Sequence, residues 1–513
     1  MPLSPRRSVV LVAAASAALL VLSGCALLPQ RHTEKPPATN VPKGYDEFYT
    51  QSLSWHSCGE GMQCTTVKAP IDWDAPTDGS IDLAVIRHRA SGTSLGSLLV
   101  NPGGPGGSGV DFVSYGATSA VSSTIADNYD VVGWDPRGVG QSTPVTCYTD
   151  PQQTDKVLYG TFDQPYDTEG WITELTADEK AFAAACQKNT GELLAHVDSA
   201  STAKDMDLIR AVLGDEKLNY LGYSYGTFLG TMYAELFPQN VGKMVLDGAL
   251  DPQVSALDEL KVQMAGFDGA FRAYMAYCLT KSDCPFSGTV DQALLQARSV
   301  LDTVDAQGLV NSDGRTLDSA TLGTAIGENL YSQNFWDDET SMFVALSKGD
   351  PSEVFTNADY YNSRNSDGSY SSNSFEVYTA VNCLDGDFVD DPRSTLDGVA
   401  EIDAAAPILG KYFAYDDYAV LDTACTNWPV PKATLPMTYD AAGAPPILVV
   451  GTTNDPATPL VWAQSLAKQL SSGVLITHTG EGHTAYNQGN ACVDGTVDGY
   501  FVKGTVPASD PMC

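Results

Sequence analysis

An apolar segment at 218–222 runs into Gly-Tyr-Ser-Tyr-Gly at 222–226, and a helical pattern that opens on small residues follows. The motif Gly-x-Ser-x-Gly between a strand and a helix predicts a sharp, strained turn that pushes a serine hydroxyl out of the strand end. Its two glycines let neighbouring backbone pass close to the turn. The motif therefore predicts Ser224 as an exposed nucleophile, in a fold where a strand feeds directly into a helix.

Short apolar runs recur along the chain and alternate with helical patterns. One helix is predicted at 202–213, where Ala203, Met206 and Ile209 share a face. Strands that alternate with helices predict an α/β fold with a mostly parallel sheet and helices on both faces. In such sheets the functional residues gather at the carboxyl ends of the strands. The predicted strands are 81–87, 97–101, 129–134, 218–222, 243–247, 446–451 and 474–478.

This alternation breaks before the last two predicted strands. Residues 255–305 and 317–348 have helical patterns, whereas 350–374 is rich in Asn, Ser, Asp and Tyr and is predicted as a loop. The two strands that follow favour an inserted cap over the alternative of an independent downstream domain. The predicted boundaries are 44–250 and 431–513 for the catalytic domain and 251–430 for a large, mainly helical cap.

The N-terminus carries two arginines before an apolar run at 9–22. This run is too short for a membrane-spanning helix and has the layout of a signal peptide. It ends in Leu-Ser-Gly-Cys, which resembles the lipobox of bacterial lipoproteins and implies that Cys25 becomes the lipidated first residue. The alternative is an ordinary signal peptide with an incidental cysteine. We predict a signal peptide at 1–24 and a polar, proline-containing tether at 25–43.

The chain is strongly acidic, with a formal charge of −35. A nucleic acid partner is therefore not expected, because its phosphate backbone would be repelled. The charge suits solubility outside a cell. We expect a monomer that is extracellular and anchored by its N-terminal lipid to the outer face of the bacterial cytoplasmic membrane, with the anchor either retained or shed. Membrane contact is expected only through that lipid.

Ten cysteines remain after Cys25. An even number of cysteines in an exported chain predicts disulfides. The sequence has no Cys-x-x-Cys pair, and its histidines are not interleaved with the cysteines as in zinc sites, so no zinc or other metal site is expected. The sequence leaves the connectivity open, and pairing between neighbours is our hypothesis. The pairs would be Cys58–Cys64, Cys147–Cys186, Cys278–Cys284, Cys383–Cys425 and Cys492–Cys513.

A serine nucleophile needs a base within hydrogen-bond reach, and the base needs a carboxylate that fixes its tautomer. In folds with this motif the order is serine, acid, histidine. His483 lies in a glycine-rich loop just past the last predicted strand, whereas His478 is expected to end that strand in a structural role. Asp455 follows the preceding strand, and its alternative role is to cap a turn. We predict His483 as the base, Asp455 as the acid and Thr458 as a hydrogen-bond donor to Asp455.

The oxyanion formed by such a nucleophile needs backbone N–H groups aimed at it. One donor is predicted at Tyr225, directly after the nucleophile. The second is predicted in the glycine-rich loop at 102–109, where Gly103 and Gly104 are candidates and Gly104 is preferred. This loop lacks the Gly-Lys-Ser/Thr of a phosphate cradle, and no cofactor is expected.

Several motifs together resemble one family. Asn-Pro-Gly-Gly-Pro-Gly at 101–106 resembles the His-Gly-Gly-Pro-Gly loop of proline iminopeptidases, and Asp-Pro-Arg-Gly-Val-Gly-Gln-Ser at 135–142 resembles the Asp-x-Arg-Gly-x-Gly-x-Ser turn of the same α/β-hydrolase family. With the serine, aspartate and histidine loops, nearly all of the mature chain resembles the secreted tripeptidyl aminopeptidases and related exported proteases of Gram-positive bacteria. Pro102 replaces the iminopeptidase histidine, which argues against strict proline release. Arg137 is expected to brace its turn.

The resemblance implies an α/β-hydrolase fold and removal of di- or tripeptides from the free N-terminus of peptides, through an acyl-enzyme and without a cofactor. Acidic cap residues would hold the substrate's ammonium group, with Asp385 as the first choice and Glu376 as the second. The alternative is that both are solvated surface acids. A serine esterase, a lipase or an endopeptidase would use the same triad. A non-catalytic binding protein is disfavoured because no triad member is missing, and Ser224 disfavours hydrolases with an aspartate nucleophile.

Overall fold

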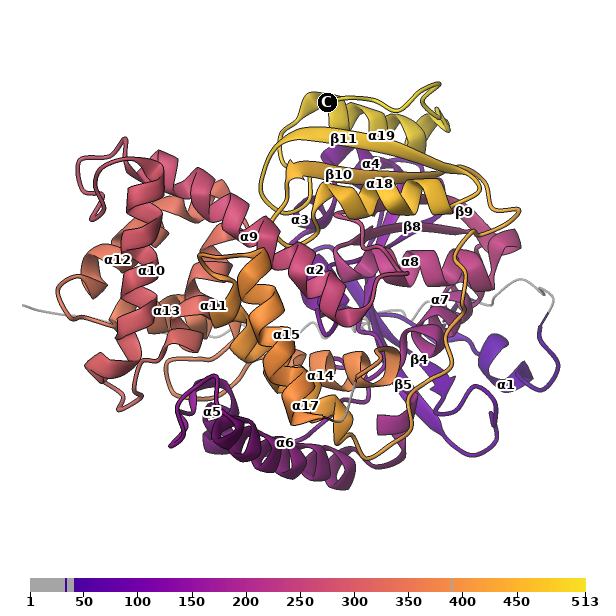
Figure 1. The fold of residues 1–513 in the computed structure, drawn as a ribbon. Helices are drawn as coiled ribbons and strands as arrows, with labels where there is room; N and C mark the ends of the chain where they lie inside the picture. The colour runs from indigo at the N-terminus through magenta and orange to yellow at the C-terminus, as the bar shows by residue number, and fades with distance from the viewer. Residues whose placement is uncertain (1–32, 35–40, 389–390) are drawn as a thin grey trace, which may run out of the picture.

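A computed structural model describes residues 33–34, 41–388 and 391–513 of the chain (Figure 1). Nine strands form one sheet in the order β11-β10-β9-β8-β6-β7-β5-β4-β3. The strands from β11 to β7 run parallel, and β5, β4 and β3 add an antiparallel edge. Two short strands, β1 (Thr33–Glu34) and β2 (Leu53–Ser54), pair separately. The nine strands are β3 (His56–Gly59), β4 (Met62–Pro70), β5 (Ser80–His88), β6 (Ser97–Asn101), β7 (Asp130–Trp134), β8 (Leu218–Tyr223), β9 (Val241–Asp247), β10 (Ile447–Asn454) and β11 (Gly473–Glu481).

Both faces of the sheet are apolar, and helices cover each of them. Successive side chains of a strand point to opposite faces, so in β10 Val449 packs in one hydrophobic core and Val450 in another. Burial of a strand on both faces requires helices on both sides, which confirms the predicted α/β class. The first core includes α7 (Ser199–Leu213), α8 (Tyr225–Leu236) and α18 (Leu460–Gln469), and the second includes α2 (Gly109–Ser114), α3 (Ala117–Ala120), α4 (Ser123–Asn128) and α19 (Ala491–Lys503).

A helical cap separates β9 from β10 and lies beside the sheet (Figure 1). It has its own hydrophobic core, which includes Phe271, Ile326 and Phe343. A mainly helical insertion before the last two strands agrees with the prediction. Its elements are α9 (Ala256–Cys278), α10 (Val290–Gln307), α11 (Ser319–Leu330), η3 (Gln333–Phe335), α12 (Trp336–Leu346), α13 (Ser352–Tyr361), α14 (Ser374–Asp385), α15 (Pro392–Ala405), α16 (Gly410–Phe413), the π-helical η4 (Ala414–Val420) and α17 (Leu421–Thr426).

Three segments differ from the sequence-based expectations. Residues 350–374, predicted as a loop, contain the helix α13, because Val354, Phe355 and Ala358 give this polar stretch a buried apolar face. The strand β4 is absent from the predicted set, since polar residues alternate with its buried ones. The helix α6 falls inside the expected catalytic boundaries, yet its Trp171 packs in the core of the cap. The helices before the cap that are not yet given are α1 (Asp46–Tyr49), α5 (Pro151–Tyr159), α6 (Glu169–Thr190), η1 (Gly191–His196) and η2 (Pro238–Asn240).

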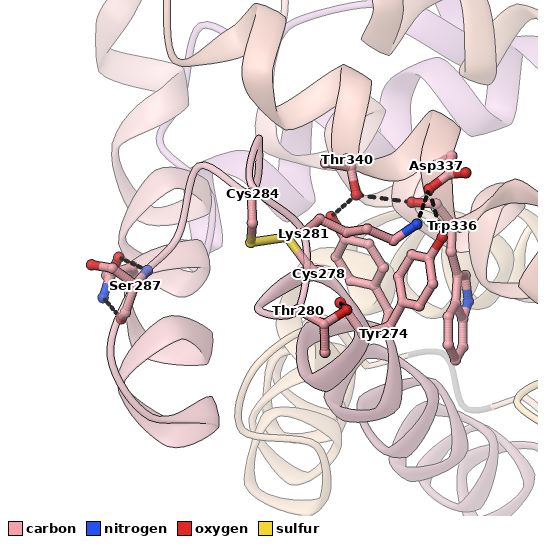
Figure 2. Close-up of a disulfide and its surroundings, with 11 residues drawn as sticks. Tyr274, Cys278, Thr280, Lys281, Cys284, Ser287, Trp336, Asp337 and Thr340 are labelled. Carbon is pink, nitrogen blue, oxygen red and sulfur yellow. Dashed lines mark hydrogen bonds and ion pairs between the residues drawn. A yellow bond between two sulfur atoms is a disulfide. The ribbon is translucent and has the colours of Figure 1, made fainter.

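Five disulfides brace the described chain, and each joins neighbouring cysteines as hypothesised. Figure 2 shows the pair at the end of α9, where Lys281 lies 3.3 Å from Asp337 of α12. The hydroxyl of Tyr277 donates to the same carboxylate at 2.6 Å. This corner of the cap is therefore held by a covalent link and by polar contacts. The disulfides are Cys58–Cys64, Cys147–Cys186, Cys278–Cys284, Cys383–Cys425 and Cys492–Cys513.

The N-terminal predictions concern residues that the structure largely leaves undescribed. The predicted signal peptide, Cys25 and most of the tether at 25–43 lie outside the described residues. Within the described ranges, none of the helices combines the length and the apolar character needed to cross a membrane.

Candidate active site

Ser224 lies at the junction of β8 and α8 with φ 54° and ψ −128°. This left-handed conformation is strained for a residue with a side chain, and it is the geometry expected of an exposed serine on a strand–helix turn. The turn is tight, because a Cβ atom added to Gly226 would lie 2.7 Å from Asn101 Oδ1. The N–H group of Ser224 donates to the carbonyl of Asp247 at the end of β9, at 2.9 Å. The neighbouring strands thus fix the position of the serine.

Asp455 and His483 lie on the loops that follow β10 and β11, and their side chains meet. His483 Nδ1 lies 2.9 Å from Asp455 Oδ1 and 3.1 Å from Oδ2. Asp455 also accepts the N–H groups of Ala457, Thr458 and Thr484 at 2.8–3.1 Å. A carboxylate held this firmly keeps the proton on Nδ1 and leaves Nε2 as the base. The predicted acid and base are therefore brought together.

Thr458 occupies the predicted supporting place beside this pair. Its hydroxyl donates to Asp455 Oδ2 at 3.0 Å and lies 3.2 Å from His483 Nδ1. Burial disfavours the charged form of His483, but the charge and hydrogen bond of Asp455 outweigh it and raise the pKa of the imidazole. Asp455 thus stabilises the imidazolium that proton transfer from a serine would create.

The cap fixes the other side of His483. Its N–H group donates to the carbonyl of Tyr331 at 2.9 Å, and the two rings meet edge to face at 5.4 Å. No hydrogen bond joins the Ser224 hydroxyl to His483 among the described residues. Such contacts often tighten only when a substrate is bound.

Two backbone N–H groups beside Ser224 are available to a substrate oxyanion. The Tyr225 N–H opens α8, where first-turn amides have no partner within the helix. Gly103 lies against the nucleophile, because a Cβ there would lie 2.8 Å from Ser224 Cβ, but its N–H donates to Asn101 Oδ1 at 2.9 Å. The N–H of Gly104 has no acceptor among the described residues. The geometry thus favours Tyr225 and Gly104 as the donors, with Gly103 as a spacer.

The predicted amine ligands are engaged elsewhere, which corrects that expectation. Asp385 accepts the N–H of Ser199 at 3.2 Å and also the Ser199 hydroxyl, so it caps the start of α7. Glu376 is buried and accepts the N–H of Tyr148 at 2.9 Å. In the fold their carboxylates satisfy backbone donors.

Three other carboxylates of the cap are candidates for an amine anchor, and we call them the cap acids: Glu259 of α9, Glu328 of α11 and Asp417 of η4. Each is partly exposed, and burial raises the pKa of each to about 7. Among the described residues none of them has a cationic partner. These acids were missed because no local motif marks them, and only the fold brings their helices together.

Tyrosines connect the cap acids with the triad. Burial is the main cause that raises the pKa of Tyr331, and the charges of Asp417 and Glu328 add to it. Burial likewise raises the pKa of Tyr378, with contributions from Asp417 and Glu259. These interactions place the cap acids within electrostatic reach of two rings, of which Tyr331 touches His483.

Two contacts join the cap to the loops of the site. Gln263, one helical turn after Glu259, donates to the carbonyl of Ala457 beside the catalytic acid, at 2.7 Å. The oxyanion loop meets the start of α14, since a Cβ on Gly106 would lie 2.6 Å from the carbonyl of Ser374. The helices that carry Glu259 and Tyr378 are thereby fixed against the catalytic loops.

Arg137 has the structural role that was expected. Its guanidinium is fully buried and pairs with Asp205 through two bonds of 2.7 and 2.8 Å. It also donates to the carbonyls of Ile71 and His196 at 2.9 and 2.7 Å. Across the described part of the chain, no group of three or more His, Cys, Asp or Glu side chains is arranged to hold a metal ion.

Comparisons with known proteins agree with this arrangement. The family described as TAP-like protein matches residues 411–513. Serine protease Hip1 of Mycobacterium tuberculosis is 35% identical over 99% of this chain and 98% of its own length. Carboxylesterase B of the same species is 39% identical over 94% and 93%. Tripeptidyl aminopeptidase of Streptomyces lividans is 30% identical over 90% and 86%.

The similarity to solved structures is low in both sequence and superposition. Proline iminopeptidase of Mycobacterium smegmatis is 14% identical, with a TM-score of 0.29 over 82% of this chain and 91% of its own. The extensive similarity to the sequence relatives decides the family. The chain belongs to the TAP-like family of α/β-hydrolase-fold serine peptidases, which includes the tripeptidyl aminopeptidases.

Proposed function

We propose that this protein is an exported serine exopeptidase that removes di- or tripeptides from the free N-terminus of peptides. The observation that carries the proposal is the set of cap acids: none of them has a cationic partner among the described residues, and Glu328 and Asp417 lie within electrostatic reach of Tyr331, which touches His483. A peptide ammonium group supplies the missing positive charge. The distance from this anchor to Ser224 would set how many residues are removed.

Acyl transfer follows from the geometry of the triad. Ser224 Oγ bonds to the scissile carbonyl carbon while His483 Nε2 accepts its proton, and the carbonyl π electrons move to oxygen. The N–H groups of Tyr225 and Gly104 stabilise that oxyanion. When it collapses, the C–N bond breaks and His483 protonates the leaving amine. Water, deprotonated by His483, then adds to the acyl-enzyme and releases the N-terminal fragment.

Removal of single cap acids tests the amine anchor. Asp417→Asn and Glu328→Gln should each raise KM for free-amine peptides about tenfold, because each removes one charged partner of the ammonium. The kcat for a small acyl ester should stay within twofold. Glu353→Gln, at an exposed carboxylate of α13, is the matched control and should leave both constants unchanged. Equal losses on N-acetylated and free peptides would refute the anchor.

The same anchor has an expected pH dependence. A carboxyl with a pKa of about 7 is neutral below that pH, so ammonium binding weakens as the pH falls. A peptide amine loses its own charge above about pH 8. KM for free-amine peptides should therefore be lowest between about pH 7 and 8, whereas KM for an ester without an amine should show no such minimum.

Ester hydrolysis is the second candidate function, because one relative is named carboxylesterase B. The triad serves both reactions, so the acyl donor decides between them. A higher kcat/KM for simple esters and acetylated peptides than for free-amine peptides would favour this candidate. Liberation of di- or tripeptides from free peptides only would exclude it as the main activity.

Anchoring through a lipid on Cys25 completes the proposal. It is supported by the Leu-Ser-Gly-Cys sequence at 22–25 and by the polar tether that follows. Cys25→Ser should move the protein from the membrane fraction of the producing cell into the soluble fraction. Immunoblots of both fractions measure this change, and an unchanged membrane share would contradict lipidation at Cys25.

A further inference from the structure

Asp247 is a buried acid next to the triad that the reaction described so far does not use. It ends β9, and this strand lies between β8, which leads to the nucleophile, and β10, which leads to the acid. Its side chain is fully buried. An acid in such a place needs hydrogen-bond donors, and their identity indicates its role.

Asp247 holds the loop of the base and the turn of the nucleophile at once. Its carboxylate accepts the N–H of Ala485 at 3.1 Å and the N–H of Tyr486 at 2.8 Å. Ala485 and Tyr486 lie two and three residues after His483 in the chain. Its main-chain carbonyl accepts the N–H of Ser224 at 2.9 Å. Asp247 therefore holds both the turn that carries Ser224 and the loop that carries His483.

The next residue passes directly beside the base. Gly248 has φ +67°, and a Cβ there would lie 3.2 Å from His483 Cε1 and 2.9 Å from Thr458 Oγ1. Its N–H donates to the carbonyl of Val450 in β10 at 3.1 Å. The chain leaving Asp247 is therefore tied to the neighbouring strand and has no room to shift toward the imidazole.

We infer that Asp247 is a positioning residue for acyl transfer: it fixes the His483 loop in register with the Ser224 turn and adds a second negative charge behind the imidazole. This role rests on the serine-hydrolase chemistry of Ser224 and is independent of exopeptidase specificity. A displacement of the base by about 1 Å is enough to lower a rate about a hundredfold.

The electrostatics are consistent with such a role. Burial raises the pKa of Asp247 to about 6. The hydrogen bonds from the N–H groups of Tyr486 and Ala485 oppose this rise. The charge of Asp455 raises this pKa further, whereas His483 lowers it. At neutral pH the carboxylate is therefore mainly ionised. Its charge adds to that of Asp455 in raising the pKa of His483. Burial raises the pKa of the neighbouring Tyr223, and the charge of Asp247 raises it further.

Two variants separate the charge of Asp247 from its position. Asp247→Asn keeps the size but loses the charge, and its amide offers one acceptor oxygen where the carboxylate offers two. We expect kcat for a small acyl ester to fall about ten- to a hundredfold with KM nearly unchanged. The acid limb of the pH profile of kcat/KM should move to lower pH, because His483 loses a negative neighbour. Asp247→Glu keeps the charge but displaces the loop, so kcat should fall without a shift of that limb.

The control is Asp318→Asn in the cap. Asp318 is also buried, accepts the N–H of Thr321 at 2.9 Å and the hydroxyl of Tyr166 at 2.8 Å, and caps α11. Its loss should lower the melting temperature without shifting the acid limb.

A folded Asp247→Asn enzyme with kcat within twofold of wild type and an unshifted limb would overturn the inference. If the Asn variant does not fold, wild-type kcat in Asp247→Glu would overturn it. Because kcat is measured on a small acyl ester, neither result tests the removal of peptides from a free N-terminus.

Discussion

Replacing Ser224 with alanine should abolish turnover, with a fall in kcat on the order of 10⁶-fold. The Ser224 hydroxyl is the atom that forms the acyl bond, and among the described residues it makes no hydrogen bond that stabilises the fold. Alanine keeps a Cβ at φ 54°, so the strain of the turn is unchanged. The melting temperature should therefore stay close to that of the wild type, and kinetics on a peptide substrate measure the loss.

Labelling by a fluorophosphonate probe gives an independent readout of the same variant. Wild-type enzyme should be labelled once, and Ser224→Ala should not be labelled. Ser114→Ala, at an exposed serine of α2, is the control and should be labelled like the wild type. Labelling of the Ser224→Ala protein at the wild-type rate would place the nucleophile elsewhere.

Replacing Asp455 with asparagine should lower kcat by about 10⁴-fold. The carboxylate accepts His483 Nδ1–H together with the N–H groups of Ala457, Thr458 and Thr484. An amide has one acceptor oxygen, and its NH₂ group would face one of these donors. The imidazole would then lose the tautomer that leaves Nε2 free. The acid limb of the pH profile should also move to lower pH, because the Asp455 charge contributes to the raised pKa of His483.

Thr458→Val is the graded comparison for this prediction. It removes only the hydroxyl that donates to Asp455 Oδ2, while the carboxylate keeps its charge and its backbone donors. We expect a fall in kcat of about tenfold, the cost of one hydrogen bond to a charged group. Equal activity of Asp455→Asn and wild type would show that another acid orients His483.

The catalytic triad could be predicted from the sequence, because a local motif marks each of its residues. Ser224, Asp455 and His483 each follow a short apolar strand, and parallel strands bring such positions to one edge of the sheet. The helix α13 was missed for a local reason as well. Its buried Val354, Phe355 and Ala358 are too few to mark a helix in so polar a segment.

The proposed amine anchor could not be derived from the sequence, because its carboxylates come from distant helices. Glu259, Glu328 and Asp417 lie on α9, α11 and η4, and no spacing rule connects them. Asp385 was expected to hold the ammonium group, whereas its carboxylate accepts the N–H of Ser199 at the start of α7. Asp247 was visible as the end of a strand, but its role depends on contacts with residues after His483. Contacts between distant segments decide these assignments.

The most direct test of the account is a mass measurement of the acyl-enzyme. Wild-type protein is mixed with a free-amine peptide ester, quenched with acid and analysed as intact protein and as proteolytic fragments, with the N-acetylated ester in parallel. We expect an added mass equal to an N-terminal di- or tripeptide, located on Ser224 and formed far more slowly from the acetylated ester. An adduct on another residue, or equal acylation by both esters, would contradict it.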